Sequence, residues 1–312
     1  MYRVENLYNN NRKKLGLELC TGQDGLKRKI CVPEAERPGL SLSGYLNPHT
    51  EGRILIFGEE ELAYLDDIGE KESASRINAI LSTKTPAVIV TRYSDPPQTL
   101  YVLCKERKIP LFRAKMDAVE LLRKISFLLI DAFAPSQSCH GSLVEVFGVG
   151  VLIQGESSVG KSEAALGLIE RGHRLISDDI VKVKRREEGF LEGSGVNISH
   201  NHMEVRGIGM INVINLFGVD CVREKKSLDI VVKLEVWDDN RFYDRLRDEE
   251  TTINILGIEV PYRVLRINPG RDVVLLIETI SLIHRLKAMG RQPAEEFNIK
   301  LLSAITHKSR KR

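Results

Sequence analysis

The sequence predicts a protein of two α/β domains, with a phosphate-binding loop in the second. Three observations support this prediction: the length of 312 residues, the alternation of short apolar runs with helical patterns, and one glycine-rich motif at residues 155–162. At roughly 100 to 200 residues a domain, the length favours two domains. Hydrophobic residues make up 42% and charged residues 29%, which is typical of a globular protein with a full core.

The overall composition argues against several classes of protein. The 46 basic and 43 acidic residues are too evenly balanced to indicate a nucleic-acid-binding surface. The five cysteines are scattered, without the spacing of a zinc site. No apolar run is long enough for a membrane span, and the first residues lack the apolar core of a signal peptide. We therefore expect a cytoplasmic protein that binds neither membranes nor nucleic acid.

Apolar patterning predicts the elements of the first domain in order. Short apolar runs indicate strands at residues 53–57 and 87–91. Helical spacing indicates helices at 73–81, 98–107 and 116–133. This alternation is typical of an α/β domain.

A change of composition places the domain boundary. The helix ending at Phe133 is followed by Ala134-Pro-Ser-Gln-Ser, which has the composition of a linker. We therefore expect domains at residues 1–133 and 134–312. In the second domain, strands are expected at 143–147, 150–154, 174–176, 180–184, 228–236 and 260–264, and helices at 164–170, 279–288 and 293–305. The basic residues 307–312 are expected to be a solvated end, although they could also touch an acidic partner.

The glycine-rich motif predicts a nucleotide phosphate site. It fits G-x-x-x-x-G-K-[S/T] at each specified position and lies between a predicted strand and a predicted helix. Backbone N–H groups of such a loop surround a phosphate, and the helix N-terminus adds its positive dipole end. Lys161 should reach the β and γ oxygens, and the Ser162 hydroxyl should bind Mg²⁺. The expected nucleotide-binding residues are Gly155, Glu156, Ser157, Ser158, Val159, Gly160, Lys161 and Ser162.

Two adjacent carboxylates follow the next predicted strand. Phosphoryl transfer requires a group that takes the proton of the attacking hydroxyl and a group that holds the metal. Asp178 and Asp179, after Ser177, could serve these roles, because repulsion between neighbouring carboxylates can raise the pKa of one toward that of a general base. Ser-Asp-Asp is equally suited to a plain turn. From these residues alone, the two readings have even odds.

Other polar segments admit both a functional and an ordinary interpretation. In residues 203–212, Glu204 and Arg206 would share one strand face before two glycines, either at a functional loop or as an ion pair on an exposed edge strand. The spacing of His200 and His202 suits a metal, but no further ligand lies near, so solvated loop residues are favoured.

Two further segments are open in the same way. His140 stands just before a predicted strand, where it could be an ordinary loop residue. The segment from Arg266 to Arg271 contains Pro269-Gly270 between arginines. It could be a turn that clamps phosphate or a plain surface turn.

Together, the order and spacing of these segments resemble the HPr kinase/phosphorylase family. The resemblance spans the second half of the chain, and its first half matches more weakly. It rests on His140-Gly-x-Leu-Val, the loop 155–162, Ser177-Asp-Asp179, Glu204-Val-Arg-Gly-Ile-Gly, Tyr243-Asp-Arg245 and Pro269-Gly-Arg271. The resemblance implies a Mg²⁺-dependent enzyme that phosphorylates a serine of the phosphocarrier protein HPr, with ATP or pyrophosphate as donor. It also implies the reverse reaction, in which inorganic phosphate removes the phosphoryl group as pyrophosphate.

The resemblance also implies roles for individual residues. Lys161 would bind nucleotide phosphates, and Ser162 and Glu204 would hold Mg²⁺. Asp179 would accept the proton of the target serine and return it in the reverse direction. The implied partner of Asp179 is His140, and Arg245 would stabilise the charge on the transferred phosphoryl group.

Further implications concern segments and the whole chain. Residues 203–212 would serve both directions, and 266–271 mainly the reverse direction. The family implies a Mur-ligase-like first domain with a regulatory or oligomerisation role, a second domain resembling phosphoenolpyruvate carboxykinase, and a hexamer. Met203 and Met210 stand where Leu or Ile is usual, and Arg266-Ile-Asn268 is an unusual sequence for the family.

Two other functions fit parts of the sequence. A small-molecule P-loop kinase would explain residues 155–179 but not the segment 204–209. A nucleotide-gated regulator would use the loop as a sensor, with the first domain or the basic end binding a partner. That reading ranks third because no basic recognition helix is evident.

Overall fold

The computed structural model describes residues 2–46, 51–196, 201–237, 251–268 and 270–291. The chain forms two compact units, Met1–Ala134 and Pro135–Arg312. Their division lies one residue beyond the expected boundary. Each unit is described by itself below. No helix within the described residues is both long and apolar enough to cross a membrane.

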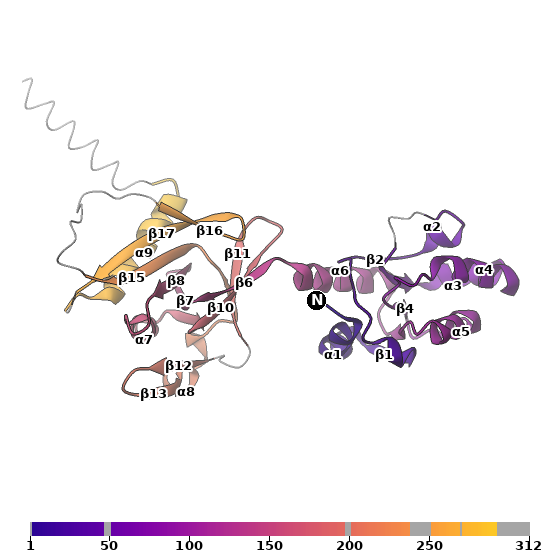
Figure 1. The fold of residues 1–312 in the computed structure, drawn as a ribbon, viewed down its shortest axis with the longest axis horizontal. Helices are drawn as coiled ribbons and strands as arrows, with labels where there is room; N and C mark the ends of the chain where they lie inside the picture. Colours follow the sequence, from indigo (N-terminus) through magenta and orange to yellow (C-terminus); the bar gives the residue numbers. More distant parts are fainter. Residues whose placement is uncertain (1, 47–50, 197–200, 238–250, 269, 292–312) are drawn as a thin grey trace, which may run out of the picture. The chain divides into compact units, whose positions relative to one another are not determined.

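The first unit is built on a five-stranded sheet in the order β1-β5-β4-β3-β2 (Figure 1). Strands β2 to β5 are parallel, and β1 runs antiparallel to β5. The central strands are buried on both faces, as expected for parallel strands covered by helices. The strands are β1 (Leu17–Thr21), β2 (Ala35–Glu36), β3 (Ile54–Phe57), β4 (Val88–Val90) and β5 (Leu111–Ala114).

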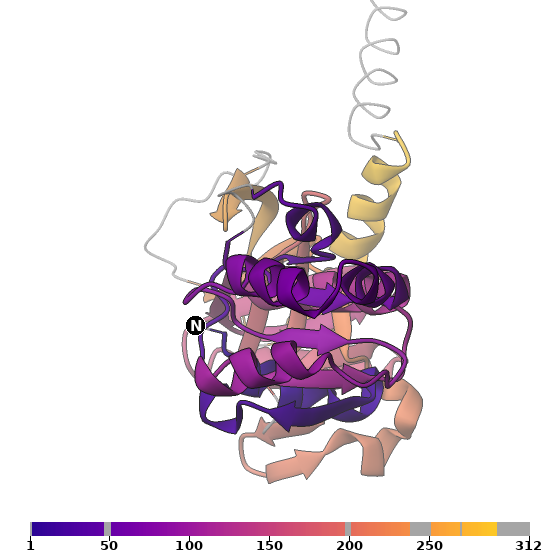
Figure 2. The same ribbon diagram turned by 90° about the vertical axis from the view of Figure 1, so that its right-hand side faces the viewer.

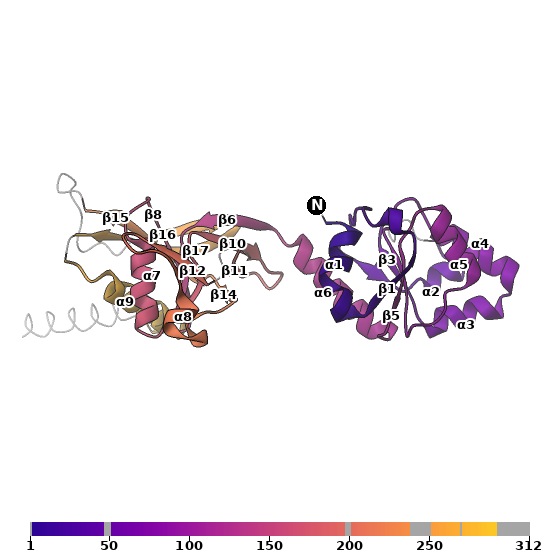
Figure 3. The same ribbon diagram turned by 90° about the horizontal axis from the view of Figure 1, so that it is seen from below.

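Helices cover both faces of this sheet. Side chains of α1 and α6 enter one core, and side chains of α2 to α5 enter another on the opposite face. Figure 3 shows the strands between these two groups of helices, and the α2 to α5 layer faces the viewer in Figure 2. The helices are α1 (Val4–Leu15), α2 (Gly39–Leu42), α3 (Glu59–Asp67), α4 (Glu70–Ile80), α5 (Gln98–Glu106) and α6 (Ala118–Phe133), with a short 3₁₀ helix at Gln23–Gly25.

The expected α/β alternation of this unit is confirmed, and α6 shows the local reason. Leu121, Ile125 and Leu129 recur every fourth residue and are buried on one helix face. The Asp117 side chain accepts a hydrogen bond from the Glu120 N–H at 2.8 Å and so caps the first turn.

The second unit contains a six-stranded sheet in the order β16-β17-β15-β8-β7-β9. Strands β8, β15 and β17 are mutually parallel neighbours, whereas β7 runs antiparallel to β8 and β9. The strands are β7 (Ser142–Val146), β8 (Val149–Gly155), β9 (Arg174–Ser177), β15 (Ile230–Val236), β16 (Thr251–Ile255) and β17 (Ile258–Ile267).

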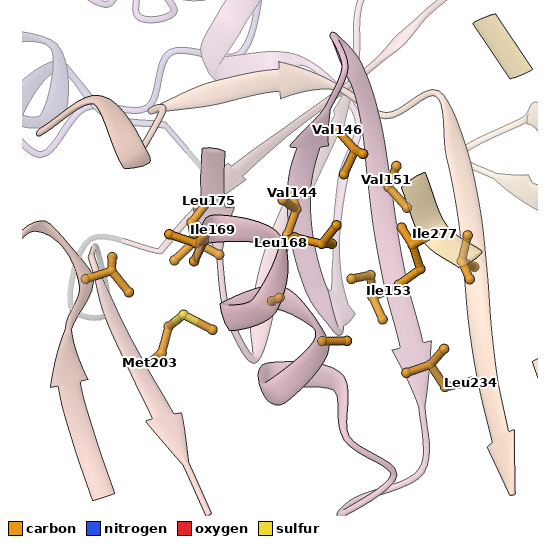
Figure 4. Packing of buried hydrophobic residues seen from close by; sticks show 14 of the residues in the cluster. Val144, Val146, Val151, Ile153, Leu168, Ile169, Leu175, Met203, Leu234 and Ile277 are labelled. Carbon is orange, nitrogen blue, oxygen red and sulfur yellow. The ribbon is translucent and has the colours of Figure 1, made fainter. Parts of the chain in front are cut away.

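One face of this sheet is covered by helices and the other by a second sheet. Leu168 of α7 (Lys161–Glu170) and Ile277 of α9 (Val273–Ala288) enter the core on the helical face, which Figure 4 shows from close by. The second sheet has the order β14-β11-β10-β6 and packs its apolar residues on the opposite face. Its strands are β6 (Ser136–His140), β10 (Ile180–Arg185), β11 (Leu191–Gly195) and β14 (Lys225–Ser227).

The linker expected at Ala134-Pro-Ser-Gln-Ser is wrong from Ser136 onward. Residues Ser136–His140 form β6, which pairs antiparallel with β10. Three of its five residues are exposed serines or a glutamine, so no apolar alternation marked it as a strand. The helix expected at 293–305 and the basic residues 307–312 lie outside the described residues.

A small hairpin and two short helices complete the unit. Strands β12 (His202–Val205) and β13 (Gly209–Asn212) pair with each other and are followed by α8 (Val213–Phe217) and a 3₁₀ helix at Val219–Cys221. Met203 and Val205 belong to the same core as α7, and Figure 4 shows Met203 between the hairpin and the helix. The hairpin is thereby anchored to α7.

Candidate active site

One edge of the six-stranded sheet gathers most of the expected site residues. Because β8 and β17 both run parallel to β15, the carboxyl ends of the three strands lie at the same edge. Strand β9 also ends there and β7 begins there, since β7 is antiparallel to both β8 and β9. This edge therefore receives the loop after β8, the turn after β9 and the turn after β17.

The loop 155–162 connects β8 to α7 as the motif predicts. At Gly155, with φ of 151°, a Cβ atom would lie 2.6 Å from the Leu234 carbonyl oxygen of the neighbouring strand. Only glycine lets the chain turn this close to β15. Lys161 Nζ donates to the carbonyl oxygens of Gly155 and Glu156, at 3.1 and 2.8 Å. The ammonium group is thereby held beside the loop backbone.

A buried carboxylate joins the loop to the turn after β9. Ser162 Oγ donates to Asp178 Oδ2 at 2.9 Å, and Ser142 Oγ donates to Asp178 Oδ1 at 2.5 Å. Asp178 is only 4% exposed, and burial raises the pKa of its carboxyl group, although the two hydroxyl hydrogen bonds work against this shift. The three residues come from the starts of β7 and α7 and the end of β9. Asp178 is thus a structural centre of the site and more than a turn residue.

Asp179 occupies a different environment from its neighbour. It is exposed and has a left-handed backbone with φ of 67°, a conformation that aspartate tolerates better than most residues. Its carbonyl oxygen accepts a hydrogen bond from the Gly141 N–H at 3.0 Å. On the paired strands, His140 lies opposite Ile180, the residue after Asp179. The Asp179 side chain is accessible to solvent, unlike that of Asp178.

Ser142 is the residue of this site that sequence reasoning missed. Its hydroxyl is fully buried and its bond to Asp178 spans 36 residues of sequence. A buried serine beside His140 carries no motif of its own. Only the pairing of β7 with β9 brings it to the carboxylate.

The hairpin β12–β13 places Glu204 and Arg206 differently from the expectation. Glu204 is in β12 and exposed, on the face opposite the buried Met203 and Val205. Arg206 follows the strand and lies in the exposed turn. The prediction that the two side chains share one strand face is therefore wrong, because the strand ends at Val205. His202 is exposed at the start of β12, and His200 lies outside the described residues.

The arginine segment 266–271 lies at the same sheet edge as the loop. Leu234 of β15 pairs with Gly155 on one side and with Leu265 on the other. Arg266 is the next residue of β17, not part of a turn as expected. Arg271 Nη1 donates to the Arg266 carbonyl oxygen at 2.8 Å, across the turn that includes Gly270. Pro269 and Arg245 lie outside the described residues.

The oxygen atoms at the foot of the loop suit a hard divalent cation. The Ser162 hydroxyl and the Asp178 carboxylate are adjacent, and Mg²⁺ binds through one or two carboxylates together with phosphate oxygens and water. In the described part of the chain, no group of three or more His, Cys, Asp or Glu side chains is arranged to hold a metal. The arrangement can bind the phosphates of a nucleotide and place a carboxylate beside them.

Comparisons with known proteins point to one family. Family models described as HPr Serine kinase N terminus and HPr Serine kinase C-terminal domain match residues 2–129 and 131–301. Proteins named HPr kinase/phosphorylase from Bacillus cytotoxicus and Bacillus mycoides are each 38% identical over 289 residues, covering 93% of this chain and 94% of the relative. A solved structure, the Hpr(Ser) kinase/phosphatase from Coxiella burnetii, is 37% identical with a TM-score of 0.47, covering 52% of this chain and 98% of that one.

Proposed function

This chain belongs to the HPr kinase/phosphorylase family, and from that membership we propose that it acts on HPr in both directions. In one direction it transfers a phosphoryl group from ATP or pyrophosphate to a serine of HPr. In the other, inorganic phosphate removes the group as pyrophosphate. The enzyme is thus both a protein-serine kinase and a phosphorylase.

The hydrogen bond between Ser162 and Asp178 is the observation that carries this proposal. It joins a phosphate-binding loop directly to a buried carboxylate at the carboxyl edge of parallel strands. Enzymes that transfer phosphoryl groups require this combination of phosphate cradle, metal-binding oxygens and a nearby proton acceptor. Asp179, exposed on the next residue, supplies the proton acceptor.

In the kinase direction, the seryl oxygen of HPr attacks the terminal phosphorus of the donor and its proton passes to the Asp179 carboxylate. The bond from phosphorus to the donor oxygen breaks, and the nucleoside diphosphate leaves. In the reverse direction, an oxygen of inorganic phosphate attacks the phosphorus of phosphoserine. The seryl oxygen leaves and takes the proton from Asp179, and pyrophosphate forms.

Other residues position the phosphates and the base. Lys161 neutralises charge on the donor phosphates, and Arg245 performs the same task for the transferred group. His140 pairs with Ile180, the residue after Asp179, and from there would orient or polarise the Asp179 carboxylate. The arginines 266 and 271, with Pro269 and Gly270 between them, hold inorganic phosphate for phosphorolysis. Arg206 and the rest of residues 203–212 serve both directions.

Mg²⁺ fits the oxygen donors at the foot of the loop. Ser162 and Asp178 would hold it, with Glu204 of the hairpin as a further ligand. When bound, the ion neutralises charge on the phosphates of the donor. Asp178 is the proposed metal ligand because its carboxylate accepts hydrogen bonds from the Ser142 and Ser162 hydroxyls and so lies against the loop. The Asp179 side chain is exposed to solvent instead.

The remaining expectations concern the whole chain. We infer a cytoplasmic hexamer that regulates carbon metabolism, with residues 1–133 as a regulatory or oligomerisation domain and 134–312 as the catalytic domain. The likeness of the first domain to Mur ligases, and of the second to phosphoenolpyruvate carboxykinase, stays a prediction.

The proposal is tested by incubating the purified protein with Mg²⁺, radiolabelled ATP and HPr, followed by excess inorganic phosphate. We expect label on a serine of HPr, and phosphate then releases it as pyrophosphate. Label that phosphate does not remove would leave a kinase without the reverse activity. Nucleotide binding without label on HPr would contradict the proposal and favour a small-molecule kinase or a nucleotide-gated regulator.

The matched variant is Asp179→Asn. It should abolish transfer in both directions while nucleotide affinity stays within about twofold, because the amide cannot accept the proton. Asn also tolerates the left-handed backbone at this position, so the turn should persist. Full turnover by this variant would rule out Asp179 as the proton acceptor.

A further inference from the structure

A buried serine beside the candidate active site has no role in the function proposed above. Ser142 is the first residue of β7 and is fully buried. The segment His140-Gly-x-Leu-Val, which supports the family resemblance, leaves the identity of residue 142 open. The serine is therefore a feature of this chain that the motif does not require. Burying a hydroxyl costs free energy unless it is hydrogen-bonded, so its presence here calls for a physical reason.

A one-residue shift in strand pairing brings Ser142 beside Asp178. The register of β7 with β9 shifts between Leu143 and Val144, so that β9 contains one extra residue. Leu143 lies opposite Ser177, and the same register continued by one position places Ser142 opposite Asp178. Without the shift, Ser142 would lie opposite Ser177. Irregularities of this kind often redirect a side chain next to an active site.

The Ser142 side chain lies on the sheet face that α7 covers. Side chains alternate between the two faces along a strand. Val144, two residues after Ser142, packs into the same core as Leu168 of α7 (Figure 4). Leu143, between them, packs on the opposite face. The hydroxyl of Ser142 therefore points toward the helix whose first turn contains Ser162.

The backbone around Ser142 is held from both sides. The Gly141 N–H donates to the Asp179 carbonyl oxygen at 3.0 Å, and Ser142 is paired with Ile153 of β8. A Cβ atom on Gly141 would lie 2.4 Å from the Ile153 carbonyl oxygen, so the chain can approach β8 this closely only with glycine. Ser142 therefore has little freedom to move away from Asp178.

Both oxygens of the Asp178 carboxylate accept a hydrogen bond from a serine hydroxyl. Ser142 donates to Oδ1 at 2.5 Å, and Ser162 donates to Oδ2 at 2.9 Å. Hydrogen bonds to an ionised carboxylate are shorter and stronger than those between neutral groups. Because each bond holds a different oxygen, the two together fix the rotation of the carboxylate.

The two hydroxyls differ in their surroundings. Ser162 is partly exposed at the start of α7, whereas Ser142 is fully buried in the strand. Ser142 therefore contacts the Asp178 carboxylate from the interior of the unit. Groups that hydrogen-bond to a metal ligand from behind orient that ligand, and their loss lowers metal affinity by about 10–100-fold.

We propose that Ser142 is a positioning residue for the divalent cation, because its hydrogen bond holds the Asp178 carboxylate in the orientation that binds the metal. This inference rests on the proposed function, which names Asp178 as a metal ligand. Ser142 acts through Asp178 and not on the cation or the nucleotide directly. Its removal should therefore weaken metal binding without changing how the loop binds a nucleotide in the absence of metal.

Metal binding by the full-length protein tests this proposal. Mn²⁺, which prefers the same oxygen ligands as Mg²⁺, is titrated into protein held in excess over ADP. Electron paramagnetic resonance measures the Mn²⁺ that stays free. A fluorescent ADP analogue, titrated in EDTA, measures nucleotide affinity without metal. Ser142→Ala should weaken Mn²⁺ binding about tenfold or more, with the metal-free nucleotide affinity within about twofold of the original.

The matched control is Ser281→Ala. Ser281 is also fully buried in the second unit, and its hydroxyl donates to the Ile277 carbonyl oxygen at 2.8 Å within α9. This variant removes the same atom from a buried position and should leave Mn²⁺ affinity unchanged.

A second test variant, Ser142→Cys, separates the hydrogen bond from the volume of the side chain. The thiol fills the space of the hydroxyl but donates only weakly. It should weaken Mn²⁺ binding as Ser142→Ala does, and it replaces that variant if alanine impairs folding.

A double variant shows whether Ser142 acts through Asp178. Asp178→Asn alone should weaken Mn²⁺ binding. Adding Ser142→Ala should weaken it little further, because the carboxylate that Ser142 positions is already absent. Independent contributions would instead multiply.

Four results would overturn the proposal. Equal effects of Ser142→Ala and Ser281→Ala on Mn²⁺ affinity would show that any buried hydroxyl matters as much. Original affinity in Ser142→Cys would assign the effect to side-chain volume. An equal loss of metal-free ADP affinity would place the effect in the loop, and multiplied losses in the double variant would show that Ser142 acts without Asp178. None of these measurements uses HPr, so a failure to phosphorylate HPr would contradict the proposed function and leave this inference standing.

Discussion

Two adjacent aspartates of this protein, Asp178 and Asp179, differ strongly in burial and in hydrogen bonding although they lie in the same turn. Asp178 is buried and accepts from two serine hydroxyls, whereas Asp179 has a left-handed backbone and is exposed. The tight turn from Ser177 to Ile180 causes this difference, because it points one carboxylate into the unit and the other into solvent. Burial of one and exposure of the other are consistent with the separate metal-binding and proton-accepting roles proposed for them.

Replacement of Asp178 by asparagine should stabilise the protein at neutral pH while abolishing activity. Burial raises the pKa of Asp178, so the folded state disfavours the ionised form. The stability that the raised pKa provides is present in full below the ordinary aspartate pKa of about 3.9. It is lost as pH rises through the pKa that Asp178 has in the folded protein. An amide at this position avoids the loss because it does not ionise, and we expect a gain of about 1 kcal/mol at pH 7.5, typical of stabilising changes at functional sites.

Urea denaturation at pH 7.5 and pH 4.5 measures this effect. The gain should shrink at the lower pH, where the original carboxyl group is more protonated. Asp179→Asn is the control, because an exposed side chain should change stability little at either pH. A variant less stable than the original protein at pH 7.5 would contradict the role of burial.

Substitution of Gly155 should weaken nucleotide binding because a side chain at this position would collide with its neighbours, and not only because of the backbone conformation. The Cβ of Gly155→Ala would meet the Leu234 carbonyl oxygen at 2.6 Å and Val159 Cγ1 at 2.7 Å, so the loop must shift. We expect at least a tenfold loss of nucleotide affinity and a cost of about 1–3 kcal/mol in stability. Titration with a fluorescent ATP analogue measures the affinity.

Gly172→Ala is the matched control for that substitution. Gly172 also has a left-handed φ, of 90°, but no atom lies within 4 Å of its Cβ position. This variant should lose about 1–2 kcal/mol of stability through backbone strain, with nucleotide affinity unchanged. Equal loss of affinity in both variants would mean that strain, and not crowding at the loop, governs binding.

At the scale of elements, the position of the hairpin β12–β13 depends on the buried face of β12. Met203 and Val205 pack into the core beside α7, and this contact sets the position of Glu204 between them. Met203 and Met210, which stand where Leu or Ile is usual in the family, should therefore contribute differently to stability. Met203 is 1% exposed, whereas Met210 is 66% exposed.

Met203→Ala should destabilise the protein by about 2–5 kcal/mol, because it removes a buried side chain and leaves a cavity. It should also lower kinase activity, since Glu204 would lose its anchored position. Met210→Ala, on the paired strand, should change stability by less than about 0.5 kcal/mol. Thermal unfolding and a kinase assay at saturating ATP measure both effects. Similar losses for the two variants would show that the hairpin is not held through Met203.

At the scale of the whole molecule, the chain has separate cores in its two units. The clusters of the first unit contain residues up to Leu129, and those of the second begin at Cys139. Each unit should therefore unfold as its own cooperative transition.

Cysteine labelling can follow the two transitions separately. Burial raises the pKa of Cys104 to about 12, so this thiol of the first unit should react only after that unit unfolds. Cys221 is buried in the second unit. Over a urea series at pH 8, mass spectrometry should show different midpoints for the labelling of Cys104 and Cys221. The exposed Cys31 should react without denaturant, as an internal control. A common midpoint for both buried thiols would contradict independent unfolding.

The sequence by itself determined the α/β class, the strand-loop-helix around residues 155–162, and about half of the helices and strands within the described residues. These features depend on local patterns: apolar periodicity, capping residues and a glycine motif whose geometry needs only its immediate neighbours. The family followed from six such motifs in order.

Only the tertiary structure decided which of the motifs meet, and how. The pairing of β7 with β9 brings Ser142 to Asp178, and the register of β8, β15 and β17 brings Arg266 to the edge where Gly155 lies. The apolar periodicity of the sequence likewise did not predict that the polar residues of β6 form a strand, or that β12 ends before Arg206. Contacts between distant residues depend on strand order and register, which no local pattern encodes, and for that reason the site had to be read from the fold.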